Sequence, residues 1–204
     1  MTDGQWVRRA ELSEVAAVAT AFAEASRDEA VSAWVMDGHP EIMTAFENDY
    51  APILIEETIG RDEVWIAGIG SDIRAVSLWQ QVDSIERYQE EAAQARTRAE
   101  GSDLRPLHRM AAVTALLAEH HPREFPHRYL YAIATVPQWR GHGAGAAIIG
   151  NRLKEAAAQG LPVYLEASTV RSSQLYERLG FARTGAPLPL PDGGPTLWPM
   201  WFRG

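Results

Sequence analysis

The sequence predicts an α/β protein with a mixed central sheet of about six to seven strands, flanked by helices. Three observations support this fold class. From Tyr129 to Thr184 the chain alternates strand, helix, strand, helix and strand, which is typical of a partly parallel sheet with helices on its faces. Within residues 64–79, two apolar runs flank a glycine-containing turn, which indicates an antiparallel hairpin. A last apolar run follows a proline-rich segment and adds another antiparallel strand.

The first half of the chain reads as one strand, a series of helices and then the hairpin. Its elements are expected at residues 5–9 (strand), from residue 11 (helix), within 28–60 (helices broken near 38–40 and at Pro52), and at 64–67 and 73–79 (strands). Two further helices are expected at 83–100 and 105–120. This helical pair lies between two strand regions, so it is either a cover over a substrate site or a packed helical hairpin.

The second half has a sharper pattern. Its elements are expected at residues 129–135 (strand), 146–159 (helix), 162–167 (strand), 172–179 (helix), 181–184 (strand) and 196–202 (strand). Gly160 and Gly180 follow the two helices directly, as is common where a helix ends in a left-handed residue.

The composition is that of one globular domain, which we expect to comprise residues 1–204. Hydrophobic residues make up 46% of the chain and charged residues 23%. No apolar run is long enough to cross a membrane, and the first residues lack a signal-peptide pattern. The chain has no cysteine, which excludes disulfides, thiolate zinc sites and cysteine nucleophiles. We therefore expect a cytoplasmic protein with no membrane partner.

The net charge of −8 argues against a nucleic-acid partner. Lys154 is the only lysine, and the arginines form no basic patch. The acidic surface either favours a cationic or neutral small molecule or simply keeps the protein in solution. We expect a small-molecule partner and a monomer or homodimer. The histidines outside the glycine loop show no metal-ligand spacing, so we expect no metal site.

The most informative segment is the glycine loop at residues 136–145. Gly141, Gly143 and Gly145 stand at alternate positions between the strand at 129–135 and the following helix. Such a loop exposes backbone N–H groups at a helix N-terminus, where the helix dipole adds positive charge. The segment therefore predicts a binding site for a phosphorylated cofactor.

Two familiar phosphate sites fit the loop poorly. A dinucleotide fold needs G-x-G-x-x-G in its first strand–turn–helix unit, whereas here the spacing is G-x-G-x-G, two thirds of the way along the chain. Only Glu166, about 20 residues further on, matches that fold. A P-loop needs a Lys-Ser or Lys-Thr pair, and the chain has none.

Two motifs resemble the GNAT superfamily of N-acetyltransferases. They are Arg140-Gly141-His142-Gly143-Ala144-Gly145 and Leu175-Tyr176-Glu177-Arg178-Leu179-Gly180-Phe181. The chain is most similar to the puromycin N-acetyltransferase-like branch, through residues 120–126 and through the ten-residue spacing from Glu166 to Tyr176. The resemblance implies a GNAT-like sheet whose strands splay apart at a site for the co-substrate acetyl-CoA.

The resemblance also implies which residues bind acetyl-CoA. They are Ile133, Ala134, Thr135, Arg140, Gly141, His142, Gly143, Ala144, Gly145, Thr169 and Ser172. Arg140 either adds positive charge or braces the loop, and His142 either touches a phosphate or points into solvent. Thr169 and Ser172 stand where members of the family carry asparagine, so the contact made there is open.

Two residues are the catalytic candidates. The resemblance implies that Tyr176 is the general acid for the departing thiolate of coenzyme A. The alternative is a core aromatic ring with its hydroxyl capped. Glu166 either takes a proton from the substrate ammonium, binds that amine electrostatically, or pairs with an arginine.

The expected function is acetyl transfer from acetyl-CoA to a primary amine by direct attack. The acceptor would be a small molecule, such as an aminonucleoside antibiotic or a metabolite. The alternatives are a non-catalytic acyl-CoA-binding module and a protein or peptide N-acetyltransferase. A module would need neither Tyr176 nor Glu166, so the presence of both favours an enzyme.

Overall fold

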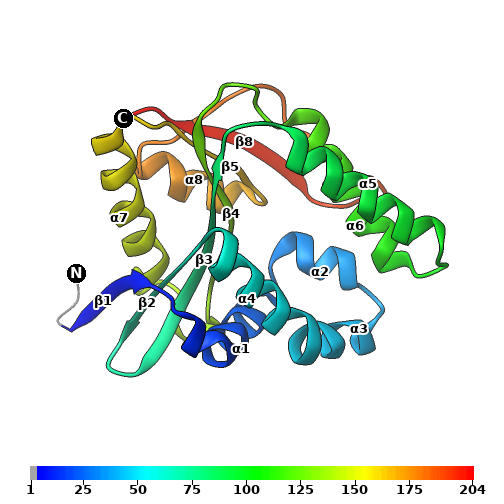
Figure 1. Cartoon of the computed structure of the whole chain (residues 1–204), viewed down its shortest axis with the longest axis horizontal. Coiled ribbons are helices and arrows are strands. Elements are labelled where there is room, and N and C mark those ends of the chain that lie inside the picture. Colours follow the sequence, from blue (N-terminus) through cyan, green and yellow to red (C-terminus); the bar gives the residue numbers. More distant parts are fainter. Residues whose placement is uncertain (1–3) are drawn as a thin grey trace.

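The computed structural model describes residues 4–204, in which eight strands form one open sheet with helices on both faces (Figure 1). The strands are β1 (Gln5–Arg9), β2 (Glu63–Ile69), β3 (Asp72–Val82), β4 (His127–Thr135), β5 (Val163–Ala167), β6 (Ala182–Arg183), β7 (Leu188–Pro189) and β8 (Thr196–Phe202). Their order is β1-β2-β3-β4-β5-β8-β6, with β7 also paired to β8. Among the described strands, only β4 and β5 are parallel neighbours. The predicted mixed α/β fold class is confirmed.

The strand count is the one correction to the predicted fold class. We expected about six to seven strands, and the described residues contain eight. The unexpected strand is β7, whose two residues pair with Thr196 and Leu197 of β8. Its sequence lies within the proline-rich segment, where local propensity favours a loop, so only the pairing with β8 makes it a strand.

The helices follow the predicted positions with small shifts at their ends. They are α1 (Val15–Ser26), α2 (Ala30–Met36), α3 (Pro40–Ala45), α4 (Ala51–Arg61), α5 (Glu86–Glu100), α6 (Arg105–His120), α7 (Ala144–Gln159) and α8 (Val170–Arg178). A π-helical turn at Phe46–Tyr50 joins α3 to α4, and short 3₁₀ turns precede α1 and α7. The predicted break near residues 38–40 separates α2 from α3.

Different helices cover the two faces of the sheet (Figure 1). On one face, α1 and α4 bury Val18, Phe22 and Ile55 against the first half of the sheet. On the other face, α7 buries Ile148 and Ile149. The helical pair α5–α6 packs over the far end of the sheet, beside β8 in the figure, so the middle of the sheet lies between two helical groups.

Side chains from β4 and β5 alternate between two buried clusters. On one face, Tyr129 and Tyr164 pack with Tyr88 of α5 and Trp201 of β8. On the other face, Leu130 and Leu165 pack with residues of α7 and α8, including Tyr176. Because successive strand residues point to opposite faces, Glu166 shares the face of Tyr164.

The parallel strands β4 and β5 pair only at their beginnings. The register joins Arg128 to Val163 and Tyr129 to Tyr164, and no further pair is formed between the two strands. Beyond this point β4 stays paired with β3, and β5 stays paired with β8. The strands therefore part in the middle of the sheet, as the resemblance implied.

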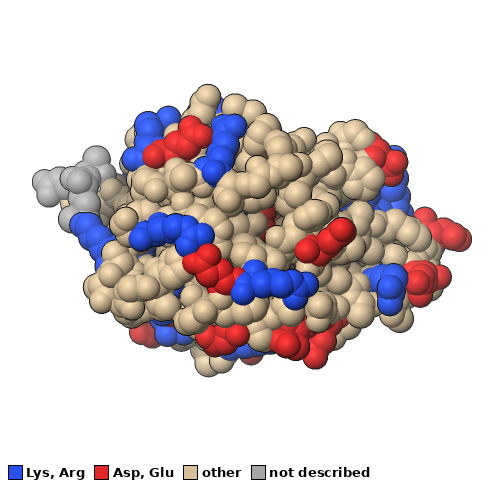
Figure 2. Space-filling model, turned by 90° about the horizontal axis from the view of Figure 1, so that it is seen from above, with Lys and Arg blue, Asp and Glu red and all other residues tan. Residues whose placement is uncertain are grey.

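Charged side chains are spread over the surface without a single-sign patch on the face drawn in Figure 2. Among residues 4–204, no helix combines the length and apolar character that crossing a bilayer requires. Within the same residues, no group of three histidine, aspartate or glutamate side chains is arranged to share a metal ion.

Candidate active site

The glycine loop connects β4 to α7 and holds an unusual backbone conformation. Gly141 and Gly143 have φ angles of +80° and +84°, a left-handed region that side chains disfavour. Gly143 is the residue immediately before α7. A side chain built at either position would meet no other atom within 4 Å, so both glycines border open space.

This loop leaves a row of backbone donors unused. Among residues 4–204, no acceptor is found for the N–H groups of Gly141, Gly143, Ala144, Gly145 and Ala146. The first turn of α7 carries no acidic side chain that would repel an anion. The donors and the dipole of a 16-residue helix therefore form a site suited to a diphosphate.

Gly145 has a different role from the other two glycines. A Cβ atom there would lie 3.2 Å from Thr135 Oγ1 and 3.7 Å from Ile133 Cδ1, both on β4. The missing side chain lets the first turn of α7 pack closely on the end of β4. A substituent at this position would first crowd the strand.

The direction of the β4 backbone determines which of its groups face the opening beside β5. The N–H of Val136 donates to the carbonyl of Arg74 on the β3 side, at 2.9 Å. The backbone N–H and carbonyl groups of successive residues point to alternate sides of a strand. Those of Ala134 therefore also point toward β3, where Ala134 lies opposite Val76. The backbone groups of Ile133 and Thr135 point the other way. Of the three predicted backbone contacts, Ile133 is therefore available at the opening and Ala134 is not. Thr135 offers only its N–H group, because its carbonyl accepts from Arg140 at 3.0 Å.

Arg140 braces the loop against α1. Its guanidinium forms two hydrogen bonds with Asp28, at 2.5 and 2.6 Å, and donates to the carbonyls of Thr135 and Ala25 at 3.0 and 3.3 Å. The pair lowers the pKa of the Asp28 carboxyl and raises the pKa of Arg140. These contacts correspond to the bracing alternative.

The other predicted polar contacts have local partners. His142 is exposed, and its Nδ1 lies 3.0 Å from the carbonyl oxygen of Arg140. Thr169 and Ser172 form a capping box at the start of α8: Thr169 Oγ1 accepts from the Ser172 N–H at 3.0 Å, and Ser172 Oγ accepts from the Thr169 N–H at 3.1 Å. These two hydroxyls therefore stabilise the N-terminus of α8.

Glu166 is a buried carboxylate, and only one of its two oxygens accepts a direct hydrogen bond in the described part of the chain. Its Oε2 accepts a hydrogen bond from the Tyr129 hydroxyl at 2.7 Å, whereas its Oε1 is buried and has no partner among residues 4–204. No arginine pairs with it within those residues. Burial raises the pKa of Glu166 to about 7, against the opposing effects of the Tyr129 hydroxyl and, to a smaller extent, the Tyr164 hydroxyl. A carboxylate with this pKa is suited to accept a proton near neutral pH.

Tyr176 of α8 has a buried ring and an uncapped hydroxyl. The ring packs against Phe181, with centroids 5.8 Å apart, in the cluster on the face opposite Glu166. The hydroxyl has no hydrogen-bond partner in the part of the chain that the structure describes. Burial and the nearby Glu29 carboxylate raise the pKa of Tyr176 above its usual value, so the phenol keeps its proton.

The structure adds residues that the sequence did not single out. Asp28 and Glu29 follow α1 and reach Arg140 and the surroundings of Tyr176 respectively. Glu29 also caps α2 by accepting from the N–H groups of Val31 and Ser32. Tyr129 binds Glu166. No local pattern marks these residues, because each contact joins segments far apart in the sequence.

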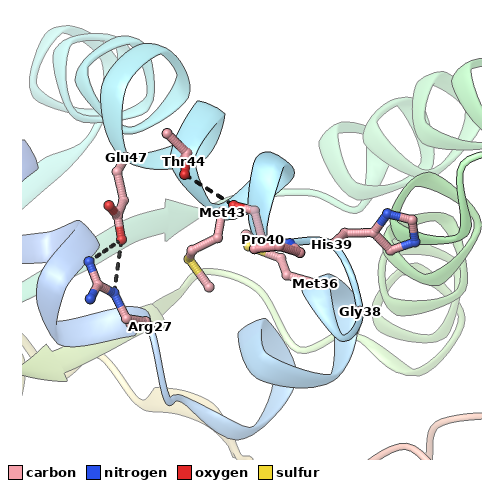
Figure 3. A pocket seen from close by; sticks show the side chains of 8 residues that line it. All are labelled: Arg27, Met36, Gly38, His39, Pro40, Met43, Thr44 and Glu47. Carbon is pink, nitrogen blue, oxygen red and sulfur yellow. Dashed lines mark hydrogen bonds and ion pairs between the residues drawn. The ribbon is translucent and has the colours of Figure 1, made fainter.

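A separate hollow of about 470 Å³ lies beside the ends of α1, α2 and α3 (Figure 3). An ion pair between Arg27 and Glu47, at 2.6 Å, lies on one side of it. Its lining is Arg27, Met36, Gly38, His39, Pro40, Met43, Thr44 and Glu47. None of the predicted site residues belongs to this lining, so the hollow is distinct from the opening between β4 and β5.

Comparison with known proteins agrees with this geometry. The model of the acetyltransferase (GNAT) family matches residues 77–181, which include β4, the glycine loop, Glu166 and Tyr176. The match covers more than half of the chain.

Solved structures share the fold over almost the whole chain. A Corynebacterium glutamicum protein described as histone acetyltransferase HPA2 and related acetyltransferase is 23% identical, with a TM-score of 0.66 over 97% of this chain and 95% of that one. A Drosophila melanogaster polyamine N-acetyltransferase that forms N-acetylagmatine is 16% identical, with a TM-score of 0.70 over 98% and 100%. A paiA N-acetyltransferase from Thermoplasma acidophilum, solved with coenzyme A, is 11% identical, with a TM-score of 0.57 over 98% and 99%.

Proposed function

Because this chain belongs to the acetyltransferase (GNAT) family, whose members use acetyl-CoA, we propose that it acetylates the primary amine of a small molecule. One observation carries the proposal. Glu166 Oε1, which is buried, and the Tyr176 hydroxyl both lack protein partners among residues 4–204, and the two side chains lie on opposite faces of the sheet at the parted strands β4 and β5. A base on one side and an acid on the other suit direct transfer between two bound substrates. We further propose that residues 1–204 act as one catalytic domain.

The donor side of the site consists of backbone groups. The free N–H groups of Gly141, Gly143, Ala144, Gly145 and Ala146 bind the diphosphate of acetyl-CoA. The outward N–H and carbonyl groups of Ile133 and the N–H group of Thr135 bind the pantetheine arm in the manner of an added strand. Acetyl-CoA supplies an activated thioester. A fixed N–H beside its carbonyl would stabilise the charge that develops there by about 3 kcal/mol.

The chain moves two protons in this proposal. Glu166 Oε1 accepts a proton from the substrate ammonium, whose nitrogen then attacks the thioester carbonyl carbon. The carbon–sulfur bond breaks as the carbon–nitrogen bond forms, and Tyr176 gives its proton to the departing sulfur. The new amide nitrogen then releases its surplus proton to solvent, Tyr176 takes a proton back from solvent, and Glu166 releases the proton it accepted, so one proton is produced in each turnover. The absence of cysteine supports this direct route without an acetyl-enzyme.

The acceptor class is supported by the relatives and by the site chemistry. Two structures with the same fold are an agmatine N-acetyltransferase and an arylalkylamine N-acetyltransferase from Aedes aegypti. A buried carboxylate among tyrosine rings suits an ammonium carried on an apolar or aromatic body. The finer assignment to puromycin-like acceptors is supported by the ten-residue spacing of Glu166 and Tyr176.

Release of free coenzyme A with a panel of amines tests the proposed function. The panel should hold agmatine, spermidine, phenethylamine, puromycin and a histone-tail peptide, each supplied with acetyl-CoA. We expect turnover with at least one small amine and slower turnover with the peptide. Tight acetyl-CoA binding without turnover of any acceptor would favour a non-catalytic module, and preferential peptide turnover would favour a protein acetyltransferase.

If Arg140 braces the loop, breaking its ion pair with Asp28 should weaken acetyl-CoA binding, whereas breaking the neighbouring pair of Arg27 and Glu47 should not. Asp28→Asn should raise the Kd of acetyl-CoA about three- to fivefold, because the glycine loop loses its anchor on α1. Arg140→Ala should raise it further, because the bond to Thr135 is also lost. Glu47→Gln, which breaks the pair with Arg27 near the same end of α1, should leave it unchanged. Tighter binding by Asp28→Asn would show instead that Asp28 competes with phosphate for Arg140.

A further inference from the structure

Tyr129 lies where β4 and β5 begin to part. It forms the last register pair between the two strands, opposite Tyr164. Its side chain is 2% exposed, and its hydroxyl donates to Glu166 Oε2 at 2.7 Å. The hydroxyl and the carboxylate thus meet on the Tyr164 face, across the gap that opens between the strands.

The two oxygens of Glu166 have different surroundings. Oε2 is occupied by Tyr129, whereas Oε1 is buried without any partner among residues 4–204. An unpartnered carboxylate oxygen inside a protein is costly unless a ligand or solvent molecule completes its hydrogen bonds. The free oxygen is therefore the one that can meet a substrate ammonium.

We propose that Tyr129 is a positioning residue for Glu166. Its hydroxyl holds Oε2, fixes the plane of the carboxylate and leaves Oε1 as the oxygen that takes the substrate proton. This inference rests on the proposed function, because it assumes that Glu166 is the base. Tyr129 does not itself touch the reacting atoms.

The two histidines beside Tyr129 carry no positive charge that could replace this hydrogen bond. His121, which follows α6, has a ring centroid 4.9 Å from that of Tyr129. His127 Nδ1 lies 2.7 Å from the carbonyl of Glu124, so it must donate, and His127 Nε2 therefore accepts from His121 Nε2 at 3.2 Å. Burial lowers the pKa of both rings, to about 3 for His121, so both are neutral.

The other elements around Glu166 also bring no positive charge to its oxygens. Tyr164 of β5 and Tyr88 of α5 are buried phenols with raised pKa values. The Tyr164 hydroxyl also lowers the pKa of Glu166, but less than the Tyr129 hydroxyl does. Pro199 of β8 lies directly opposite Glu166 in the register. Arg87 of α5 acts electrostatically on Tyr88, but it is held by Asp62 and Glu91 at 2.8 and 2.9 Å. The Tyr129 hydroxyl is therefore the main group that stabilises the charged form of Glu166.

The dependence of kcat/KM on pH tests the inference. The wild type should lose activity below pH 7, because protonated Glu166 cannot accept a proton, and Glu166→Gln should remove this acid limb. Tyr129→Phe should move the limb upward by about one pH unit, because the carboxylate loses a hydrogen bond that favours its charged form. On agmatine, or the fastest amine of the panel, kcat/KM should fall about tenfold at pH 6 and less than about twofold at pH 9.

A matched control and a second variant separate positioning from folding. Tyr88→Phe removes a buried hydroxyl from the same cluster, but that hydroxyl donates to Gln80 at 2.7 Å, so the limb should stay in place. Site-specific replacement of Tyr129 by 3-fluorotyrosine keeps the ring and the hydroxyl. Its more acidic phenol is a stronger donor and should move the limb downward.

The outcomes separate the inference from the proposed function. The positioning role would be overturned if neither Tyr129→Phe nor 3-fluorotyrosine at position 129 moved the acid limb. It would also be overturned if Tyr129→Phe lowered kcat/KM equally at every pH. An unchanged profile in Glu166→Gln would instead refute Glu166 as the base, and with it the proposed mechanism. Opposite shifts from the two changes would support the inference.

Discussion

Replacing Gly143 with valine is expected to weaken coenzyme A binding by about 100-fold or more. Gly143 has φ +84° and precedes the free N–H groups of α7, so a branched side chain would enter the space where the diphosphate must lie. The left-handed conformation would also strain valine and turn the donors away. Losing two hydrogen bonds to a charged phosphate corresponds to about 3 kcal/mol or more. Calorimetric titration with coenzyme A measures the change.

Gly150→Val is the matched control for this substitution. Gly150 lies in the middle of α7, and a side chain built there meets no other atom within 4 Å. The control should bind coenzyme A like the wild type. Equal binding by Gly143→Val and the wild type would mean that the diphosphate does not use this loop.

Removing the hydroxyl of Tyr176 is expected to lower kcat about 100-fold, with little change in the KM for acetyl-CoA. The departing thiolate would then leave without a proton donor, whereas the ring would still fill its place beside Phe181. Because burial and Glu29 raise the pKa of Tyr176, the wild type should show no alkaline limb from this group below pH 10. Steady-state kinetics of the wild type and of Tyr176→Phe between pH 6 and 10 test both statements.

Tyr50→Phe controls for the loss of a phenol elsewhere. Tyr50 lies in the π-helical turn with 54% of its surface exposed, and its substitution should leave kcat unchanged. If Tyr176→Phe turned over at the wild-type rate throughout this pH range, the assignment of the general acid would be wrong. A raised KM at constant kcat would point to a packing role.

Features that depend on neighbouring residues could be predicted from the sequence. The glycine loop, the helix that follows it and strand β8 rest on local spacing and on helix-ending glycines, and the structure has them at the predicted places. The fold class followed from the order of these elements. The short strand β7 could not be predicted, because two residues in a proline-rich segment have no strand pattern of their own.

The capping box at Thr169 is a signal that the sequence contained and that we did not use. A threonine followed three residues later by serine, directly before the helix predicted at residues 172–179, is a pattern in which both hydroxyls bind the backbone. The family resemblance directed attention to cofactor contacts at these positions. The structure gives both hydroxyls a local role in α8.

Long-range features of the site required coordinates. The bond from Arg140 to Asp28 joins residues 112 positions apart, and the bond from Tyr129 to Glu166 spans 37. The backbone direction that separates Ala134 from Ile133 depends on the register with β3, which no single-strand pattern specifies. For these reasons the sequence could predict the type of chemistry but not how Glu166 and Arg140 are held.

Calorimetric titration of the wild-type protein with coenzyme A and with pantetheine tests the central claim most directly. Pantetheine keeps the thiol-bearing arm but lacks the diphosphate and the nucleotide. If the free amides after β4 grip the diphosphate, coenzyme A should bind at least about 100-fold more tightly than pantetheine, as expected for several hydrogen bonds to a charged group. Equal affinities for the two molecules, or no heat with coenzyme A, would contradict the account.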